Sequence, residues 1–215
     1  FIQIRFYETA KVDDLSLLME HSKNLNFKSI DFILKFDPKE TDIHRIESLI
    51  RSFPVISTIV VHSSPEDSIQ NYMADSEVTY RNRIMHIKQQ INSCSGCGII
   101  NLEGMFVPSL NSYIENSLHN SCLNKKISID ESGKIKNCPS MSKQFGDIKS
   151  TRLEQVVSDA EFLSVWDITK DKITICKDCE YRNICLDCRA YTKAPHDLYS
   201  KPSKCKYDPY SAEWN

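Results

Sequence analysis

The sequence predicts an α/β protein in which a partial, barrel-like parallel βα sheet is followed by a small cysteine-rich domain with a β-hairpin and helices. Two observations carry this prediction. Strand-like and helix-like patterns alternate in the first part of the chain, and seven of the nine cysteines gather between Cys122 and Cys205. We therefore expect a partial α/β region over residues 1–92 and a cysteine-rich domain over residues 93–215.

Apolar residues with period two mark strands in the first region, and apolar residues at helical spacing mark helices. In chain order we predict a strand over 1–6, a helix over 12–25, a strand over 30–36, a helix over 42–52 capped by Thr41, and a strand over 55–61. This order implies a parallel sheet with right-handed crossovers. Three strands fit a fragment of a larger sheet or barrel, and a small complete α/β domain is the alternative.

The chain between the third strand and the cysteine-rich domain has weaker patterns. Residues 63–80 are polar and predict a loop, residues 80–91 predict a helix, and residues 99–102 predict a short strand. The helix would lead into a loop that contains Cys94 and Cys97. We expect this stretch to connect the two regions.

A hairpin and a helix are predicted within the cysteine-rich domain. Residues 126–130 and 134–136 alternate as two strands, and Gly133 lies in the turn between them, where a positive φ is needed. Residues 151–166 predict one amphipathic helix. Its inward-facing residues would be Leu153, Val156, Val157, Leu163 and Trp166.

Composition excludes several classes of function. The net charge of −2 argues against a nucleic-acid-binding protein. No run approaches the roughly 20 apolar residues of a membrane helix, and we find no signal-peptide pattern. Nine cysteines without an export signal indicate the reducing cytoplasm, where thiolates hold metal more often than they form disulfides. Because the chain begins with Phe1 inside a strand pattern, we expect it to be the C-terminal part of a longer protein.

The seven cysteines of the second region have a definite order. They are Cys122 and Cys138 with Gly133 between them, a tight group of Cys176, Cys179, Cys185 and Cys188, and a final Cys205. We expect the hairpin to bring Cys122 and Cys138 together. Pairs of cysteines separated by two residues grip a metal from a short turn.

Iron–sulfur clusters fit this spacing better than zinc does. Structural zinc sites separate two cysteine pairs by about a dozen residues or more, whereas five residues separate Cys179 from Cys185. One zinc ion held by all four cysteines of the tight group would be crowded. Sharing Cys185 and Cys188 between two neighbouring metal centres relieves this crowding. Two [4Fe–4S] clusters require about eight thiolates, which the seven cysteines and one of Cys94 or Cys97 supply. Zinc is the alternative metal.

The order and spacing of these cysteines resemble the SPASM domain, the C-terminal extension of radical-SAM peptide maturases. One departure is that the family has three residues between the last two cysteines of the tight group, where this chain has two. The surrounding residues resemble the grasp-with-spasm subfamily, which works beside an ATP-grasp ligase on small ribosomal peptides. The matching segments are 122–130, 135–141, 166–171 and 185–191, with Lys201 and Pro202 before Cys205.

The resemblance implies two auxiliary [4Fe–4S] clusters, a precursor peptide as substrate and an ATP-grasp ligase as partner. Cys176, Cys179, Cys185 and Cys205 would hold one cluster, and Cys122, Cys138 and Cys188 would hold the other. The fourth ligand of the latter would be Cys97 or Cys94, with His119 as a weaker candidate.

No catalytic residue is predicted. Radical-SAM chemistry needs a Cys-x3-Cys-x2-Cys loop for the cluster that cleaves S-adenosylmethionine, and this sequence contains none. Either that loop lies upstream of Phe1 and the protein is a radical-SAM-type maturase, or the chain is a non-catalytic module that presents the precursor to the ligase. A zinc-stabilised structural domain is the third hypothesis. Near the cysteines, Arg189, Tyr191, Lys201 and Tyr207 either support the clusters or contact the peptide.

Overall fold

The computed structural model describes residues 1–73, 80–97, 100–101 and 109–214. The chain forms two compact units, Phe1–Cys97 and Gly98–Asn215. Cys94 and Cys97 therefore belong to the first unit, and the other seven cysteines belong to the second. Among the described residues, no helix has both the length and the apolar character needed to cross a bilayer.

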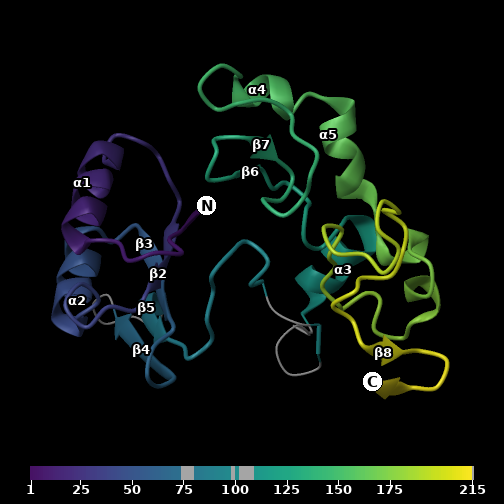
Figure 1. Cartoon of the computed structure of the whole chain (residues 1–215), viewed down its shortest axis with the longest axis horizontal. Helices are drawn as coiled ribbons and strands as arrows, with labels where there is room; N and C mark the ends of the chain where they lie inside the picture. Colours follow the sequence, from purple (N-terminus) through teal and green to yellow (C-terminus); the bar gives the residue numbers. More distant parts are fainter. Residues whose placement is uncertain (74–79, 98–99, 102–108, 215) are drawn as a thin grey trace. The chain divides into compact units, whose positions relative to one another are not determined.

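The described part of the first unit is a mixed, mostly parallel sheet of five strands with two helices (Figure 1). Its elements are β1 (Ile2–Arg5), α1 (Val12–Ser22), β2 (Ile30–Lys35), α2 (Ile43–Ser52), β3 (Ile56–His62), β4 (Ser68–Met73) and β5 (Tyr80–His86). The strand order is β1-β2-β3-β5-β4, in which β4 alone among these strands runs antiparallel to its neighbour. The predicted strand–helix alternation from β1 to β3 is confirmed.

The core of the first unit lies between the sheet and the two helices, which contact each other (Figure 1). Right-handed crossovers between strands in sequential order place successive helices on the same face of a sheet. Leu15 and Met19 of α1 and Ile46 of α2 are 2% exposed or less and pack with Phe32 of β2. Burying each such side chain contributes about 1.5–3 kcal/mol, so this apolar layer holds the unit together.

Asp42, and not the predicted Thr41, caps α2. The carboxylate of Asp42 accepts the N–H groups of His44 at 3.0 Å and Arg45 at 3.4 Å. The Thr41 hydroxyl donates instead to the carbonyl oxygen of Asp37 at 2.7 Å. Thr41 thus closes the loop before the helix, and the cap prediction is wrong because two adjacent residues are both of a capping type.

Strands β4 and β5 occupy residues for which we predicted a loop and a helix, so both predictions are wrong. Ile69 on the edge strand β4 is 62% exposed, and such a strand needs few apolar residues. In β5, Asn82 and Ile84 are buried and Arg83 between them is exposed, which is strand alternation. The Asn82 amide donates to the carbonyl oxygen of Pro54 at 3.3 Å, so a tertiary contact overrides its weak strand propensity.

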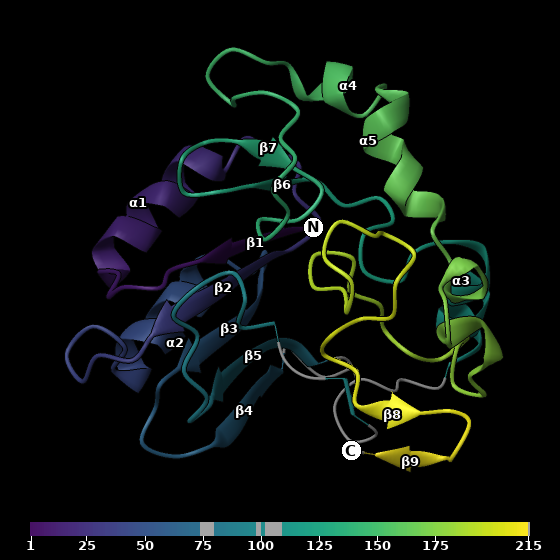
Figure 2. The same cartoon turned by 45° about the vertical axis from the view of Figure 1, so that its right-hand side comes forward.

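The second unit consists of short elements joined by turns (Figure 2). They are α3 (Leu110–Leu118), β6 (Ser128–Ile129), β7 (Ile135–Lys136), α4 (Leu153–Val156), α5 (Ala160–Ser164), β8 (Tyr207–Asp208), β9 (Glu213–Trp214) and the 3-10 turns η1 (Val165–Asp167), η2 (Lys170–Lys172) and η3 (Cys176–Asp178). Strands β6 and β7 form the predicted hairpin. Half of the strand predicted over 99–102 lies outside the described residues, and within the described half Ile100 forms a parallel bridge with Cys205.

The single helix predicted over 151–166 is wrong, because the chain forms α4, a break, α5 and η1. Asp159 causes the break by capping α5, where its carboxylate accepts the N–H groups of Glu161 at 2.7 Å and Phe162 at 3.3 Å. Of the residues predicted to face inward, Val156 is buried and Leu163 and Trp166 are partly buried, whereas Leu153 and Val157 are exposed. Phe162 fills the core instead.

Candidate metal centre

The β6–β7 hairpin has the turn that we predicted between Cys122 and Cys138. Gly133 has a φ of +80°, which confirms the need for glycine at this position. Asp130 holds the turn, since its carboxylate lies 2.7 Å from the Lys136 ammonium and accepts the N–H of Lys134 at 2.9 Å. These two interactions, that of Lys136 first, lower the pKa of Asp130.

A first group of thiols consists of Cys122, Cys138 and Cys188. Burial raises the pKa of the Cys122 thiol to about 11, and the charges of Cys138 and Cys188 add to this rise. The Asn120 side-chain carbonyl fixes the turn by accepting the N–H groups of Cys122 at 3.1 Å and Leu123 at 3.0 Å.

A second group of thiols lines one small cavity of about 20 Å³ that opens to solvent. Its members are Cys176, Cys179, Cys185 and Cys205. The 3-10 turn η3 begins at Cys176 and is followed directly by Cys179, whose N–H donates to the carbonyl oxygen of Cys176 at 3.1 Å. The structure therefore brings together the four cysteines that the resemblance assigns to one cluster.

Burial raises the pKa of Cys176, Cys179 and Cys185 in the second group. It takes the pKa of Cys185 to about 12. The positive charge of Lys170 opposes this effect at all three thiols. A thiol must lose its proton to bind metal, so a metal centre in the cavity would replace protons that the fold otherwise retains.

The donor set fits an iron–sulfur cluster in kind. All nine cysteines lie within the described residues and are free thiols. Among the described residues, no three His, Cys, Asp or Glu side chains converge closely enough to hold a single metal ion. Sulfur atoms around one zinc ion lie ~3.8 Å apart, whereas a four-iron cluster occupies the space between its thiolates and holds them further apart. Four thiols around one cavity supply the kind of ligand that either centre takes.

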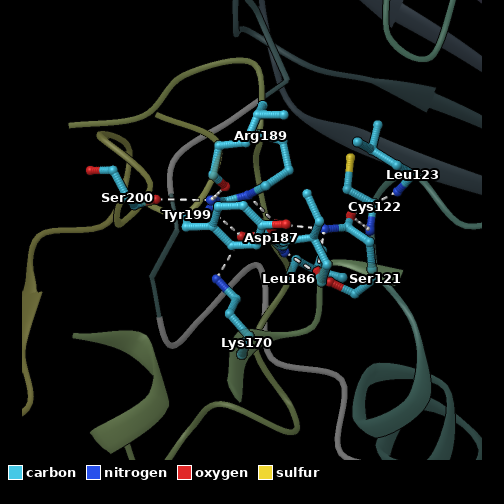
Figure 3. A network of polar contacts seen from close by, with 12 residues as sticks. Ser121, Cys122, Leu123, Lys170, Leu186, Asp187, Arg189, Tyr199 and Ser200 are labelled. Atoms are coloured by element: carbon cyan, nitrogen blue, oxygen red, sulfur yellow. Dashed lines mark hydrogen bonds and ion pairs between the residues drawn. The ribbon is translucent and has the colours of Figure 1, made fainter. Parts of the chain in front are cut away.

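A buried network of charges is centred on Asp187, which lies between Cys185 and Cys188 in the sequence (Figure 3). The Asp187 carboxylate accepts hydrogen bonds from Arg189 at 2.5 and 2.7 Å and from the Asn120 amide at 2.7 Å. It also lies 2.9 Å from the Lys170 ammonium. Burial favours the neutral acid, but Lys170 and Arg189 prevail and lower the pKa of Asp187.

This network ties the surroundings of one thiol group to those of the other. Asn120 holds the turn of Cys122, and the Asp187 N–H donates to the Ser121 hydroxyl at 2.8 Å. In the other direction, Arg189 donates to the carbonyl oxygens of Leu198 at 2.6 Å and Ser200 at 2.8 Å. Loops that carry cysteines of both groups therefore depend on one carboxylate.

Two buried lysines line the four-cysteine cavity. Lys170 and Lys201 are each 5% exposed, and the Lys201 ammonium donates to the carbonyl oxygen of Tyr207. Their positive charges offset the negative charge that thiolate ligands would bring to the cavity. Arg189 and Tyr207 are also buried, at 3% and 4% exposure, which favours support of the thiol groups over contact with a peptide.

The candidates for an eighth ligand lie apart from these groups in the chain. Cys94 is half-buried and Cys97 is exposed, both in the first unit after β5. His119 ends α3, and its Nδ1 lies 3.7 Å from the carboxylate of Asp167. The identity of the eighth ligand stays a prediction.

Sequence reasoning missed Asn120, Lys170 and Asp187 as parts of the site. Lys170 belongs to the polar run Lys170–Lys172, which has the composition of an exposed turn, yet its side chain is buried. The position of Asp187 between Cys185 and Cys188 is the one signal that pointed to it. A carboxylate between two metal-binding cysteines needs either solvent or a cation beside it.

No family model, curated protein or solved structure matches this chain. The grouping of the thiols and the buried charges beside them are therefore the observations on which a functional proposal depends.

Proposed function

We propose that this chain is an iron–sulfur protein of the SPASM type that takes part in the maturation of a ribosomally made peptide together with an ATP-grasp ligase. The grouping of the thiols supports this proposal. Four cysteines that the resemblance assigns to one cluster line one cavity, and Cys122 neighbours Cys138 and Cys188. Nine free thiols also agree with a reducing cytoplasmic location.

In this proposal, each thiol group holds one [4Fe–4S] cluster, which when bound would conduct electrons or anchor the peptide. Cys176, Cys179, Cys185 and Cys205 hold one, and Cys122, Cys138 and Cys188 hold the other with Cys97 or Cys94. Lys170 and Lys201 offset the charge of the four-cysteine second group, and Asp187 orients the loops of both groups.

Metal analysis tests the presence of the clusters. The protein is purified without oxygen, reconstituted with iron and sulfide, and assayed for iron, sulfide and zinc. We expect about eight irons and about eight sulfides per chain, since each cluster contributes four of each. One or two zinc ions with no sulfide would instead support the zinc-stabilised domain and refute the cluster proposal.

Single cysteine variants test the division of the ligands. Cys205→Ala should lose about half of the iron, because it belongs to one group only. Cys188→Ala should lose the other half, and the double variant should lose nearly all. Equal and complete loss in both single variants would contradict two separate centres. Cys94→Ala and Cys97→Ala, compared in the same way, identify the eighth ligand.

Two further assays separate the enzyme from the recognition module. The natural full-length protein is reduced with dithionite in the presence of S-adenosylmethionine, and cleavage of this cofactor supports a radical-SAM-type maturase. Co-expression with a candidate precursor peptide and an ATP-grasp ligase, followed by mass spectrometry of the peptide, then tests maturation. Absence of cleavage together with binding to the precursor favours the non-catalytic module. A peptide whose mass is unchanged by removal of this chain would refute a role in maturation.

A further inference from the structure

A second cavity shares a wall with the four-cysteine cavity. It holds about 260 Å³, close to the lower end of the ~300–1,000 Å³ of ligand sites in proteins. Ile175, Lys201 and Cys205 line both cavities. A ligand in the second cavity would therefore lie directly beside the four-cysteine group, at Cys205.

The second cavity is positively charged. Lys193, Lys201 and Lys206 line it against the single carboxylate of Asp208, which leaves a net charge of +2. Asp208 is already engaged, since it accepts the N–H of Tyr210 at 2.9 Å. Lys193 and Lys206 are exposed, and neither ammonium forms an ion pair or hydrogen bond with another described residue. Their positive charges are therefore available to an anionic ligand.

Backbone hydrogen bonds fix the positions of Lys193 and Lys201 relative to each other. The N–H of Lys193 donates to the carbonyl oxygen of Lys201 at 2.8 Å, and Thr192 forms a bridge with Pro202. The N–H of Ser203 donates to the carbonyl oxygen of Tyr191 at 2.9 Å. Lys193 and Lys201 thus lie across from each other on two strands of backbone, so their spacing is set by the fold.

The shared wall contains a strained residue. Ile175 has a φ of +70° and a ψ of −47°, a conformation that a β-branched residue rarely adopts. It precedes Cys176 directly, and the surrounding turn is held by the N–H of Lys177, which donates to the carbonyl oxygen of Ile173 at 3.0 Å. Backbone strain of this kind clusters at ligand sites and active sites.

We propose that the second cavity binds a carboxylate of an acidic peptide and holds that peptide beside Cys205. That the peptide is a substrate rests on the proposed function, whereas its binding to the lysines does not require iron. Lysine ammonium groups bind carboxylates through charge and through up to three N–H donors each. A nucleic acid is the less fitting polyanion, because the whole chain carries a net charge of −2.

Fluorescence anisotropy on the full chain tests this proposal. The first probe is a fluorescein-labelled, C-terminally amidated peptide of alternating glutamate and glycine, and the second replaces each glutamate by glutamine. A third, glutamine-containing peptide keeps its free C-terminal carboxylate, which distinguishes a side-chain carboxylate from a terminal one. Binding is measured for the parent chain and for Lys193→Gln/Lys206→Gln. The matched control, Lys125→Gln/Lys149→Gln, removes two exposed lysines of the same unit that do not line the cavity.

We expect a peptide with carboxylates to bind about five- to tenfold more tightly than the amidated glutamine peptide at low salt, with the difference shrinking as salt rises. The cavity variant should lose this preference, and the control should keep it. Equal binding of all peptides, equal loss in the control, or tighter binding of an oligonucleotide would overturn the proposal. Iron measured on the same samples separates the two claims. Iron-loaded protein without peptide preference refutes this inference alone, and iron-free protein that retains it refutes the clusters alone.

Discussion

Replacing Asp187 by asparagine should destabilise the second unit strongly. Each oxygen of the Asp187 carboxylate faces two N–H donors, at 2.5 to 2.9 Å. In either orientation an amide would direct its own N–H₂ at two of these donors and would leave Lys170 and Arg189 buried without a counter-charge. Breaking a buried ion pair from one side costs about 3–5 kcal/mol, a large part of the ~5–15 kcal/mol that stabilises an ordinary protein.

Urea denaturation of metal-free parent and variant, followed by circular dichroism, measures this cost. A loss of about 3–5 kcal/mol corresponds to a fall in the unfolding midpoint of about 1–2.5 M urea for a protein of this size. The matched control is Asp171→Asn, which removes a carboxylate that is 56% exposed and lies 2.9 Å from Arg182. An exposed pair of this kind contributes about 1 kcal/mol or less.

The comparison of the two variants decides the outcome. If Asp187→Asn shifts the midpoint no further than Asp171→Asn does, the buried network does not stabilise the unit and our reasoning is refuted. The iron content of the parent and variant after reconstitution provides a second measure of the effect of Asp187→Asn. Because Asp187 supports loops of both thiol groups, we expect the variant to lose iron from both, unlike Cys205→Ala.

Two other predictions concern the backbone and the thiols. Gly146→Ala should lower the free energy of unfolding, measured with urea, by about 3 kcal/mol, because Gly146 has a φ of +132° and an added Cβ would overlap the Thr151 side chain. Gly133→Ala, where the atom nearest to an added Cβ is 3.4 Å away, should lower it by only about 1 kcal/mol. Equal losses would contradict the steric argument. In metal-free protein, Cys122 and Cys185, with pKa values of about 11 and about 12, should react with iodoacetamide at pH 8 at least about tenfold more slowly than a thiol of pKa 9.0. Since these pKa values are raised on folding, the thiols contribute stability below pH 9.0 that is lost as the pH rises toward 11 to 12, which pH-dependent unfolding would measure.

The sequence predicted the elements whose signals are local. The strands β1, β2 and β3 and the helices α1 and α2 have apolar periodicity of their own, and Gly133 marks its turn chemically. The break before α5 was missed because Asp159 is compatible with the apolar spacing on both sides of it, and its capping bonds depend on the backbone. Strands β4 and β5 were missed because they are polar and acquire their pairing from the sheet.

The candidate site likewise contains residues that could be predicted from local sequence and residues that could not. Cysteine spacing carries strong chemical information, so the thiols themselves could be predicted. The buried charges could not, because nothing in the local sequence around Lys170 distinguishes a buried lysine from an exposed one. Its burial follows from Asp187, which lies 17 positions later in the chain. Contacts of this kind arise from the tertiary fold and leave no periodic pattern.

The segment from Cys185 to Cys188 also sets a length scale for electron flow. One of its thiols belongs to each group, and with two residues between them their Cα atoms can be at most about 11 Å apart. If both groups hold clusters, this covalent span limits the gap that an electron must cross between them. Inserting residues into this span would widen the gap and slow transfer, even in a protein that retained its full complement of iron.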